Sequence, residues 1–267
     1  MKKIILTSIL TSALLCGFAQ NKVGDIVKAG DQYFAYIAEF KSPEANEEFQ
    51  NNVAIVQQQN SQIKQLQDQI KAEKSEDQKR FLEATLSKIQ QDYKQNANLM
   101  SKAYGFAENR TYKQVYFESN LCFMLTKDEI AKLKLDDGTL LDPLKMVNKS
   151  NFSMYRAKKV SGAQENEKLQ NVFADLIGKQ VELNKVRKQV SETKDALEQK
   201  KLNEKLTALE NQIKTIDANL RKTYGIPEKR DYAVEISNSR LYVLLTKEEV
   251  AKIEAQIAKA KKNTSKK

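Results

Sequence analysis

The chain has 267 residues, of which 30% are charged and 7% aromatic, and its formal net charge is +10. It contains no histidine, which removes the usual general base at neutral pH, the commonest metal ligand and every histidine-dependent catalytic triad. Only eight glycines and three prolines occur, which argues against a loop-rich all-β fold and favours long helices. We therefore expect a helix-rich protein that is not an enzyme.

The first residues have the pattern of a secretory signal peptide. Lys2 and Lys3 precede the uncharged run 4–16, which is shorter than the roughly 20 residues that a membrane-spanning helix needs. The small residues Gly17 and Ala19 are spaced as in a signal-peptidase site. The sequence predicts cleavage after Ala19 and export of the mature chain to the periplasm or out of the cell.

The two cysteines have different expected fates. A lipoprotein acylated at Cys16 is an alternative to cleavage after Ala19, but Leu15 is large where the lipoprotein peptidase favours a small residue. Cleavage after Ala19 leaves Cys122 as the only cysteine, so the mature chain forms no intramolecular disulfide. Cys122 lies in an apolar segment, which predicts a buried thiol and not a nucleophile.

The basic excess favours acidic partners, including anionic membrane surfaces and acidic polypeptides, because it raises encounter rates. No basic patch is interleaved with aromatic residues, so we expect no nucleic-acid partner. The sequence has no phosphate-binding loop or dinucleotide fingerprint, and its carboxylates are spread along helix faces among Lys and Gln. We expect no catalytic residues, no cofactor and no metal site.

The chain resembles itself at a shift of 120 residues. Tyr104 and Gly105 align with Tyr224 and Gly225, and the same shift holds without a gap from 46/166 to 132/252. Such self-similarity predicts a tandem duplication. The expected parts are a signal peptide at 1–19, a first copy at 20–134, a linker at 135–148, a second copy at 149–256 and a basic disordered tail at 257–267.

Each copy contains two amphipathic runs. Apolar residues recur at spacings of mainly three and four residues from Phe49 to Ile70 and from Leu82 to Met100, and again 120 residues later. This spacing is typical of a coiled-coil seam. A polar segment separates the runs, at 71–77 in the first copy, which predicts an antiparallel helical hairpin. One continuous helix is the alternative, because no Gly or Pro marks the tip.

Two seam positions are polar in both copies, at Asn60 and Gln67 in the first and at Gln180 and Arg187 in the second. Polar residues in a seam weaken the pairing but restrict its register and partner. Equally, the helix could turn its face there towards the neighbouring apolar residues, Leu66 and Val186.

Strand-forming residues follow each pair of helices. The expected strands are 111–118 and 121–125 in the first copy and 231–236 and 241–245 in the second, separated by Ser119-Asn120 and Ser239-Arg240. A capping box, at Thr126 to Glu129 and again 120 residues later, then starts a short helix. With a strand near 33–40 and 153–160, each copy reads as strand, helical hairpin, two strands and short helix. The expected fold class is α+β, predominantly α.

Arg110 and Arg230 are equivalent residues of the two copies, as are Tyr112 and Tyr232. They could contact a ligand at the base of each pair of helices. Residues kept in both copies more often hold the common fold, so we favour a role in tying the helix exit to the first strand.

The order of a signal peptide, a strand, a charged helical hairpin, the strand region Gln114 to Leu125 and a helix from Lys127 to Ile130 resembles the Skp/OmpH family of periplasmic chaperones. The resemblance implies a basic protein that captures unfolded outer-membrane proteins between helical arms on a small β-body. That family has one unit per chain and forms trimers, whereas this chain has shorter arms and a duplicated unit. Client size and stoichiometry should therefore differ.

The sequence thus predicts a periplasmic holdase that holds unfolded envelope proteins between basic helical arms. Such a holdase should leave apolar residues exposed on the arms, and the candidates are Ile55, Phe81 and Ile177. The alternative is a structural or adhesive coiled-coil scaffold of the cell envelope, which predicts fully paired seams. Both functions are compatible with a homo-oligomer.

Overall fold

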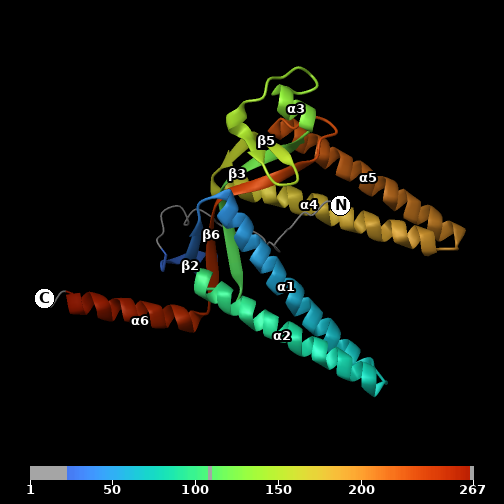
Figure 1. Cartoon of the computed structure of the whole chain (residues 1–267). Coiled ribbons are helices and arrows are strands. Elements are labelled where there is room, and N and C mark those ends of the chain that lie inside the picture. Colours follow the sequence, from blue (N-terminus) through green and yellow to red (C-terminus); the bar gives the residue numbers. More distant parts are fainter. Residues whose placement is uncertain (1–22, 108–109, 265–267) are drawn as a thin grey trace. The chain divides into compact units, whose positions relative to one another are not determined.

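The computed structural model describes residues 23–107 and 110–264, with side chains described as far as residue 256. The elements in chain order are β1 (Ile26–Ala29), β2 (Gln32–Phe40), α1 (Pro43–Ala72), α2 (Glu76–Tyr104), β3 (Tyr112–Leu125), α3 (Lys127–Lys132), the 3₁₀ turn η2 (Pro143–Lys145), β4 (Met146–Asn148), β5 (Ser153–Ser161), α4 (Ala163–Glu192), α5 (Ala196–Tyr224), β6 (Tyr232–Leu245) and α6 (Lys247–Thr264) (Figure 1). The protein is α+β and predominantly helical, with antiparallel strand pairs. The expected signal peptide lies outside the described residues.

The chain forms two compact units whose boundaries fall inside strands. Unit 1 joins the chain up to Val115 to the chain from Asn238 onwards, and unit 2 is Tyr116–Ser237. The strands are hydrogen-bonded in the order β1-β2-β6-β3-β5-β4. Because β3 and β6 each cross a boundary, each unit contains the long helices of one sequence copy and strand residues of both copies.

The prediction of two separate strands after each pair of helices was wrong, because β3 and β6 are each continuous over 14 residues. The expected breaks contain Ser119 and Ser239, which are fully buried. The Ser119 hydroxyl donates a hydrogen bond to Asn166 Oδ1, and the Ser239 hydroxyl donates one to Asn46 Oδ1. Because each buried hydroxyl has a hydrogen-bond partner inside the protein, the serine does not need to be exposed to water in a turn. The strand therefore continues through it.

Two side-by-side helices form an arm in each unit (Figure 1). Arm 1 is α1 and α2, and arm 2 is α4 and α5. In arm 1 the first helix ends at Ala72, and Ser75 caps the second by accepting a hydrogen bond from the Gln78 backbone N–H at 3.5 Å. The chain therefore breaks at the polar segment without Gly or Pro. Gly105 ends α2 in the left-handed conformation, at φ 68°, which glycine adopts without steric cost.

A hydrophobic core lies at the base of each arm. In unit 1 its buried residues are Phe40, Phe49, Val53, Val56, Met100 and Leu241. In unit 2 they are Leu121, Phe123, Val160, Leu169, Phe173, Leu220 and Ile226. Leu241 of the second copy thus completes the core around the first copy's helices, and Leu121 of the first copy does the same in unit 2. Burying one leucine contributes about 1.5–3 kcal/mol, so each core depends on a strand from the other copy.

The start of each arm is fixed by a buried asparagine. Asn46 is 1% exposed, and its amide donates hydrogen bonds to the carbonyls of Phe40 at 3.3 Å and Ser42 at 2.8 Å. Asn166 makes the same bonds to Val160 at 3.3 Å and Gly162 at 2.9 Å. These bonds satisfy carbonyl groups at the strand-to-helix corner and set the direction in which the arm leaves the sheet.

The last described element is a helix longer than the expected short one. α6 continues to Thr264, so its backbone is helical through most of the segment 257–267, which the sequence predicts to be disordered. Within the expected linker 135–148, the last three residues form β4, which pairs with β5. No described helix has both the length and the apolar composition needed to cross a membrane.

Candidate binding surface on the helical arms

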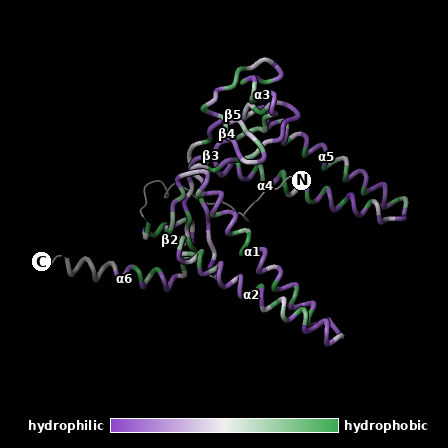
Figure 2. The backbone as a smooth tube through the Cα atoms, in the orientation of Figure 1, coloured by the Kyte–Doolittle hydropathy of each residue, from purple (hydrophilic) through white to green (hydrophobic). Residues whose placement is uncertain are grey.

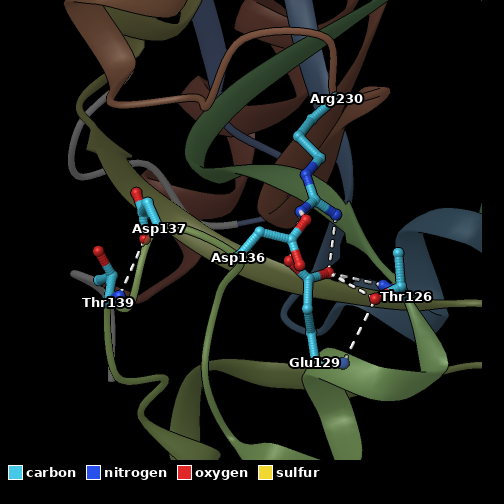
Figure 3. A network of polar contacts seen from close by, with 6 residues as sticks. All are labelled: Thr126, Glu129, Asp136, Asp137, Thr139 and Arg230. Atoms are coloured by element: carbon cyan, nitrogen blue, oxygen red, sulfur yellow. Dashed lines mark hydrogen bonds and ion pairs between the residues drawn. The ribbon is translucent and has the colours of Figure 1, made fainter.

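The repeated Arg230 belongs to a network inside unit 2 (Figure 3). Its guanidinium donates two hydrogen bonds to the carboxylate of Glu129, one of them at 2.7 Å, and it also forms an ion pair with Asp136 at 3.0 Å. The Glu129 side chain is 2% exposed and also accepts from the Thr126 backbone N–H at 2.8 Å. Burial would raise the pKa of Glu129, but the hydrogen bonds from Arg230 and Thr126 outweigh burial and lower the pKa.

Arg110 makes the equivalent contacts in unit 1. It donates two hydrogen bonds to the Glu249 carboxylate and one, at 2.8 Å, to the carbonyl of Leu244. The hydrogen bond from Arg110, together with one from Thr246, lowers the pKa of Glu249 to about 2. Each arginine therefore joins the start of a strand to the capping box of the other copy's helix. Both guanidinium groups are therefore hydrogen-bonded within the fold, which agrees better with a structural role than with a ligand contact.

Arm 1 exposes three large apolar side chains. Phe81 is 72% exposed, Leu99 is 56% exposed and Ile55 is 46% exposed. All three lie off the seam, so the packing of the two helices does not cover them. Arm 1 is otherwise mostly hydrophilic along its length (Figure 2).

Phe81 lies beside a shallow, open hollow at the tip of arm 1. The hollow has a volume of about 530 Å³. Its other lining residues, from both helices, are Gln69, Ala72, Glu73, Gln78 and Leu82. An exposed aromatic ring beside an open hollow can contact an apolar segment without enclosing it.

Arm 2 exposes a different set of apolar residues. Leu197 is 66% exposed, Val181 is 64% exposed and Val172 is 38% exposed. Ile177, expected from the sequence to be exposed, is half-buried. These three residues and Leu99 are not among the exposed residues predicted from the sequence, although each is an apolar residue outside the seam.

The polar seam positions do not lie between the helices. Asn60, Gln67, Gln180 and Arg187 are all exposed. Of their apolar neighbours, Leu66 is half-buried and Val186 is 1% exposed. The helices have therefore turned towards the apolar neighbours of the polar positions, which was one of the two interpretations of the sequence.

The expected excess of positive charge is not on arm 1. Residues 43–104 contain eight basic and nine acidic side chains, and residues 163–224 contain twelve and ten. The net charge of each arm is therefore close to zero, and the arm exerts little long-range electrostatic attraction on a charged partner. Apolar contacts, and not basic charge, distinguish the surface of arm 1.

The described residues contain neither an exposed Cys122 thiol nor a cluster of metal-binding side chains. Cys122 is fully buried, and burial raises the pKa of its thiol to about 12, so it is protonated at neutral pH. No group of three or more carboxylate or thiol side chains is placed to bind a metal ion in the described part of the chain. Comparisons of the chain with protein-family models, with curated proteins and with solved structures find no match.

Proposed function

We propose that this chain is an exported, non-enzymatic holdase that keeps apolar segments of unfolded envelope proteins in solution by holding them against its helical arms. The observation that carries the proposal is the exposure of large apolar side chains on arms whose bases are well packed, with Phe81 at 72% the most exposed of them. Several separate apolar contacts suit loose binding of varied segments, whereas a single small ligand would need an enclosed pocket.

The proposal includes a tandem duplication and paired coiled-coil hairpins. In support, the first residues of corresponding elements recur at the shift found in the sequence, as at Pro43 and Ala163, Glu76 and Ala196, and Tyr112 and Tyr232. After a duplication, the residues that hold the fold stay similar in both copies, while the exposed residues diverge. The arms' unlike apolar residues then give one chain two different binding surfaces. The location, in the periplasm after cleavage at Ala19, and the relation to the Skp/OmpH family are parts of the same proposal.

A second candidate is a structural scaffold of the cell envelope, which predicts arms with closed seams. The packing of arm 2 favours it, because Leu183, Val186 and Leu209 form a buried cluster between α4 and α5. The lack of full burial along much of arm 1 favours the holdase, so we rank the holdase first.

Replacing Phe81 by serine should weaken the holding of an unfolded protein without changing stability. The test uses the mature chain from Gln20 and follows the aggregation of a urea-diluted outer-membrane barrel protein by light scattering. Because Phe81 is exposed, we expect a free energy of unfolding within about 0.5 kcal/mol of the unmodified chain. We expect several-fold more chaperone to be needed for the same suppression.

Lys201→Ser is the matched control, because Lys201 is the arm 2 residue equivalent to Phe81. It should leave suppression unchanged. Suppression by the unmodified chain should also persist at high salt, since arm 1 has nearly balanced charge. A folded chain that suppresses nothing would rule out the holdase and leave the scaffold, whose partners crosslinking in the envelope would identify.

A further inference from the structure

The two arms have the same frame but differ in how their outer halves are packed. In arm 2, Leu183 is 3% exposed, Val186 is 1% exposed and Leu209 is 6% exposed. In arm 1 the equivalent residues are Ile63, Leu66 and Ile89, and all three are only half-buried. None of the side chains from residue 57 to residue 96 is fully buried. Similar apolar residues are therefore buried in one arm and only half-buried in the other.

The arms also differ in the polar pairs that join their two helices. In arm 2, Arg187 donates a hydrogen bond to Glu210 at 2.7 Å and Lys205 forms an ion pair with Glu182 at 2.7 Å. Lys179 also donates to Gln212 at 2.9 Å. These contacts join α4 to α5 on both sides of the buried cluster.

Arm 1 has no opposite charges at the two equivalent ion-pair positions. Gln67 and Gln90 replace the Arg187–Glu210 pair, and Gln62 and Thr85 replace the Glu182–Lys205 pair. In the seam itself, Asn96 stands where arm 2 has Ile216, and it donates a hydrogen bond to Gln59 at 3.1 Å. Each exposed ion pair stabilises only modestly, but together with full burial of the seam such pairs favour a closed arm.

We infer that the outer half of arm 1, residues 57–96, opens as a local unit while the base of the arm and arm 2 stay closed, and that the opened helices bind an apolar polypeptide segment. Segments with few fully buried apolar contacts open at a lower free energy than the packed core. Opening would uncover six half-buried apolar residues, which are the seam residues Ile63, Ile70, Leu82, Leu86 and Ile89 and their neighbour Leu66.

The composition of the outer half of arm 1 points to an apolar and largely uncharged occupant. Residues 57–96 contain seven basic and six acidic side chains, so neither an acidic nor a basic partner is selected. The half-buried seam residues supply apolar contact area, and the glutamines of both helices can form hydrogen bonds with an exposed peptide backbone. The binding part of this inference rests on the proposed function, whereas the opening part stands without it.

Hydrogen exchange of the full mature chain, read by mass spectrometry without any client, tests the opening. The backbone amides of 57–96 should exchange about tenfold or more faster than those of 177–216, which are the equivalent residues of arm 2. Equal rates in the two segments would overturn the inference.

Transferring the ion pairs of arm 2 to arm 1 tests the cause. The variant Gln62→Glu/Thr85→Lys/Gln67→Arg/Gln90→Glu should slow exchange in 57–96 several-fold and leave 177–216 unchanged. A like-charge pair at two of the same positions, Gln62→Glu/Thr85→Glu, should accelerate exchange in 57–96. If the transferred pairs leave the exchange rate unaltered, cross-helix pairing does not control the opening.

The same variant separates opening from binding. With the urea-diluted barrel protein as the probe, the variant with slowed exchange should hold less client than the unmodified chain. If its arm closes but it holds as much client, the opened seam is not the binding surface, although the opening itself stands. If the unmodified chain holds no client, the proposed function and the binding part both fail, and the exchange rates alone decide the opening.

Discussion

Replacing Arg230 by methionine is expected to lower the free energy of unfolding by about 3–5 kcal/mol, because it leaves the carboxylate of Glu129 buried without its cation. The Glu129 side chain is 2% exposed, and Arg230 donates two of its hydrogen bonds. Methionine keeps the length of the apolar stem, so the loss reports the charge and the hydrogen bonds more than the packing. Urea denaturation followed by circular dichroism at neutral pH measures it.

The pH dependence of the same variant gives an independent check. In the unmodified chain the pKa of Glu129 is lowered, so its stabilising contribution is present above the glutamate pKa of the unfolded chain and is lost as the pH falls through the folded-state pKa. In the Arg230→Met variant burial raises the pKa of the same carboxyl group, so acidification should stabilise the variant relative to its state at neutral pH. The difference in stability between the two proteins should therefore shrink as the pH falls towards about 4.

Arg110→Met is the matched control within the chain. It removes the equivalent guanidinium, but its partner Glu249 has a side chain that is 33% exposed and can be solvated after the substitution. We therefore expect a clearly smaller loss than for Arg230→Met. An equal loss of unfolding free energy at the two sites would show that the destabilisation comes from lost packing or a lost strand contact, and not from a buried carboxylate left without its cation.

The order of helices and strands follows from local patterns, but the interruption predicted at Ser119 and Ser239 does not occur. A serine followed by a polar residue within a strand-forming segment is compatible with a turn. The buried partner of Ser119 is Asn166, 47 residues away along the chain. Only the tertiary structure brings the two together, so no local pattern could have shown that these strands continue.

The exposed apolar residues were partly predictable. Ile55 and Phe81 stand outside the seam, and the structure leaves both exposed. Ile177 stands next to the seam residue Leu176 and is half-buried, because the face that a helix turns to its partner is wider than a single line of residues. The difference between the arms could not be read from the seams, whose apolar residues are similar. The arms also differ in their polar residues: cross-helix ion pairs occur in arm 2, and uncharged side chains occupy the equivalent positions of arm 1.

The partners of Arg110 and Arg230 show a further limit of reading each copy by itself. The capping-box glutamate in the same copy as Arg110 is Glu129, but Arg110 pairs with Glu249 of the other copy. In the same way, Arg230 pairs with Glu129. Leu121 and Leu241 are exchanged in the same way between the two cores. The self-similarity at a shift of 120 residues was visible in the sequence, but these pairings were not, because pairing within a copy and pairing between copies would satisfy the same pattern of residues.

This exchange predicts that the first copy alone, residues 20–134, is not a stable folded monomer. Without the second copy the arm 1 core lacks Leu241, and Arg110 lacks Glu249. A second molecule of the fragment can supply both contacts, because Leu121 and Glu129 are the equivalent residues. We therefore expect a symmetric dimer whose folded fraction rises with concentration.

The mass of the fragment in solution and its helicity over a range of concentrations test this prediction. The substitution Leu121→Ser should abolish the dimer and the fold together, because it removes the strand residue that each molecule donates to the other. Phe81→Ser in the same fragment should leave the dimer intact, since Phe81 is exposed on the arm. A fragment that is folded and monomeric even when dilute would mean that strand 116–125 can fold back onto its own arm. Strand 116–125 could then pack either on its own arm or on the other one, and the exchange of strands in the full chain would not be required for folding.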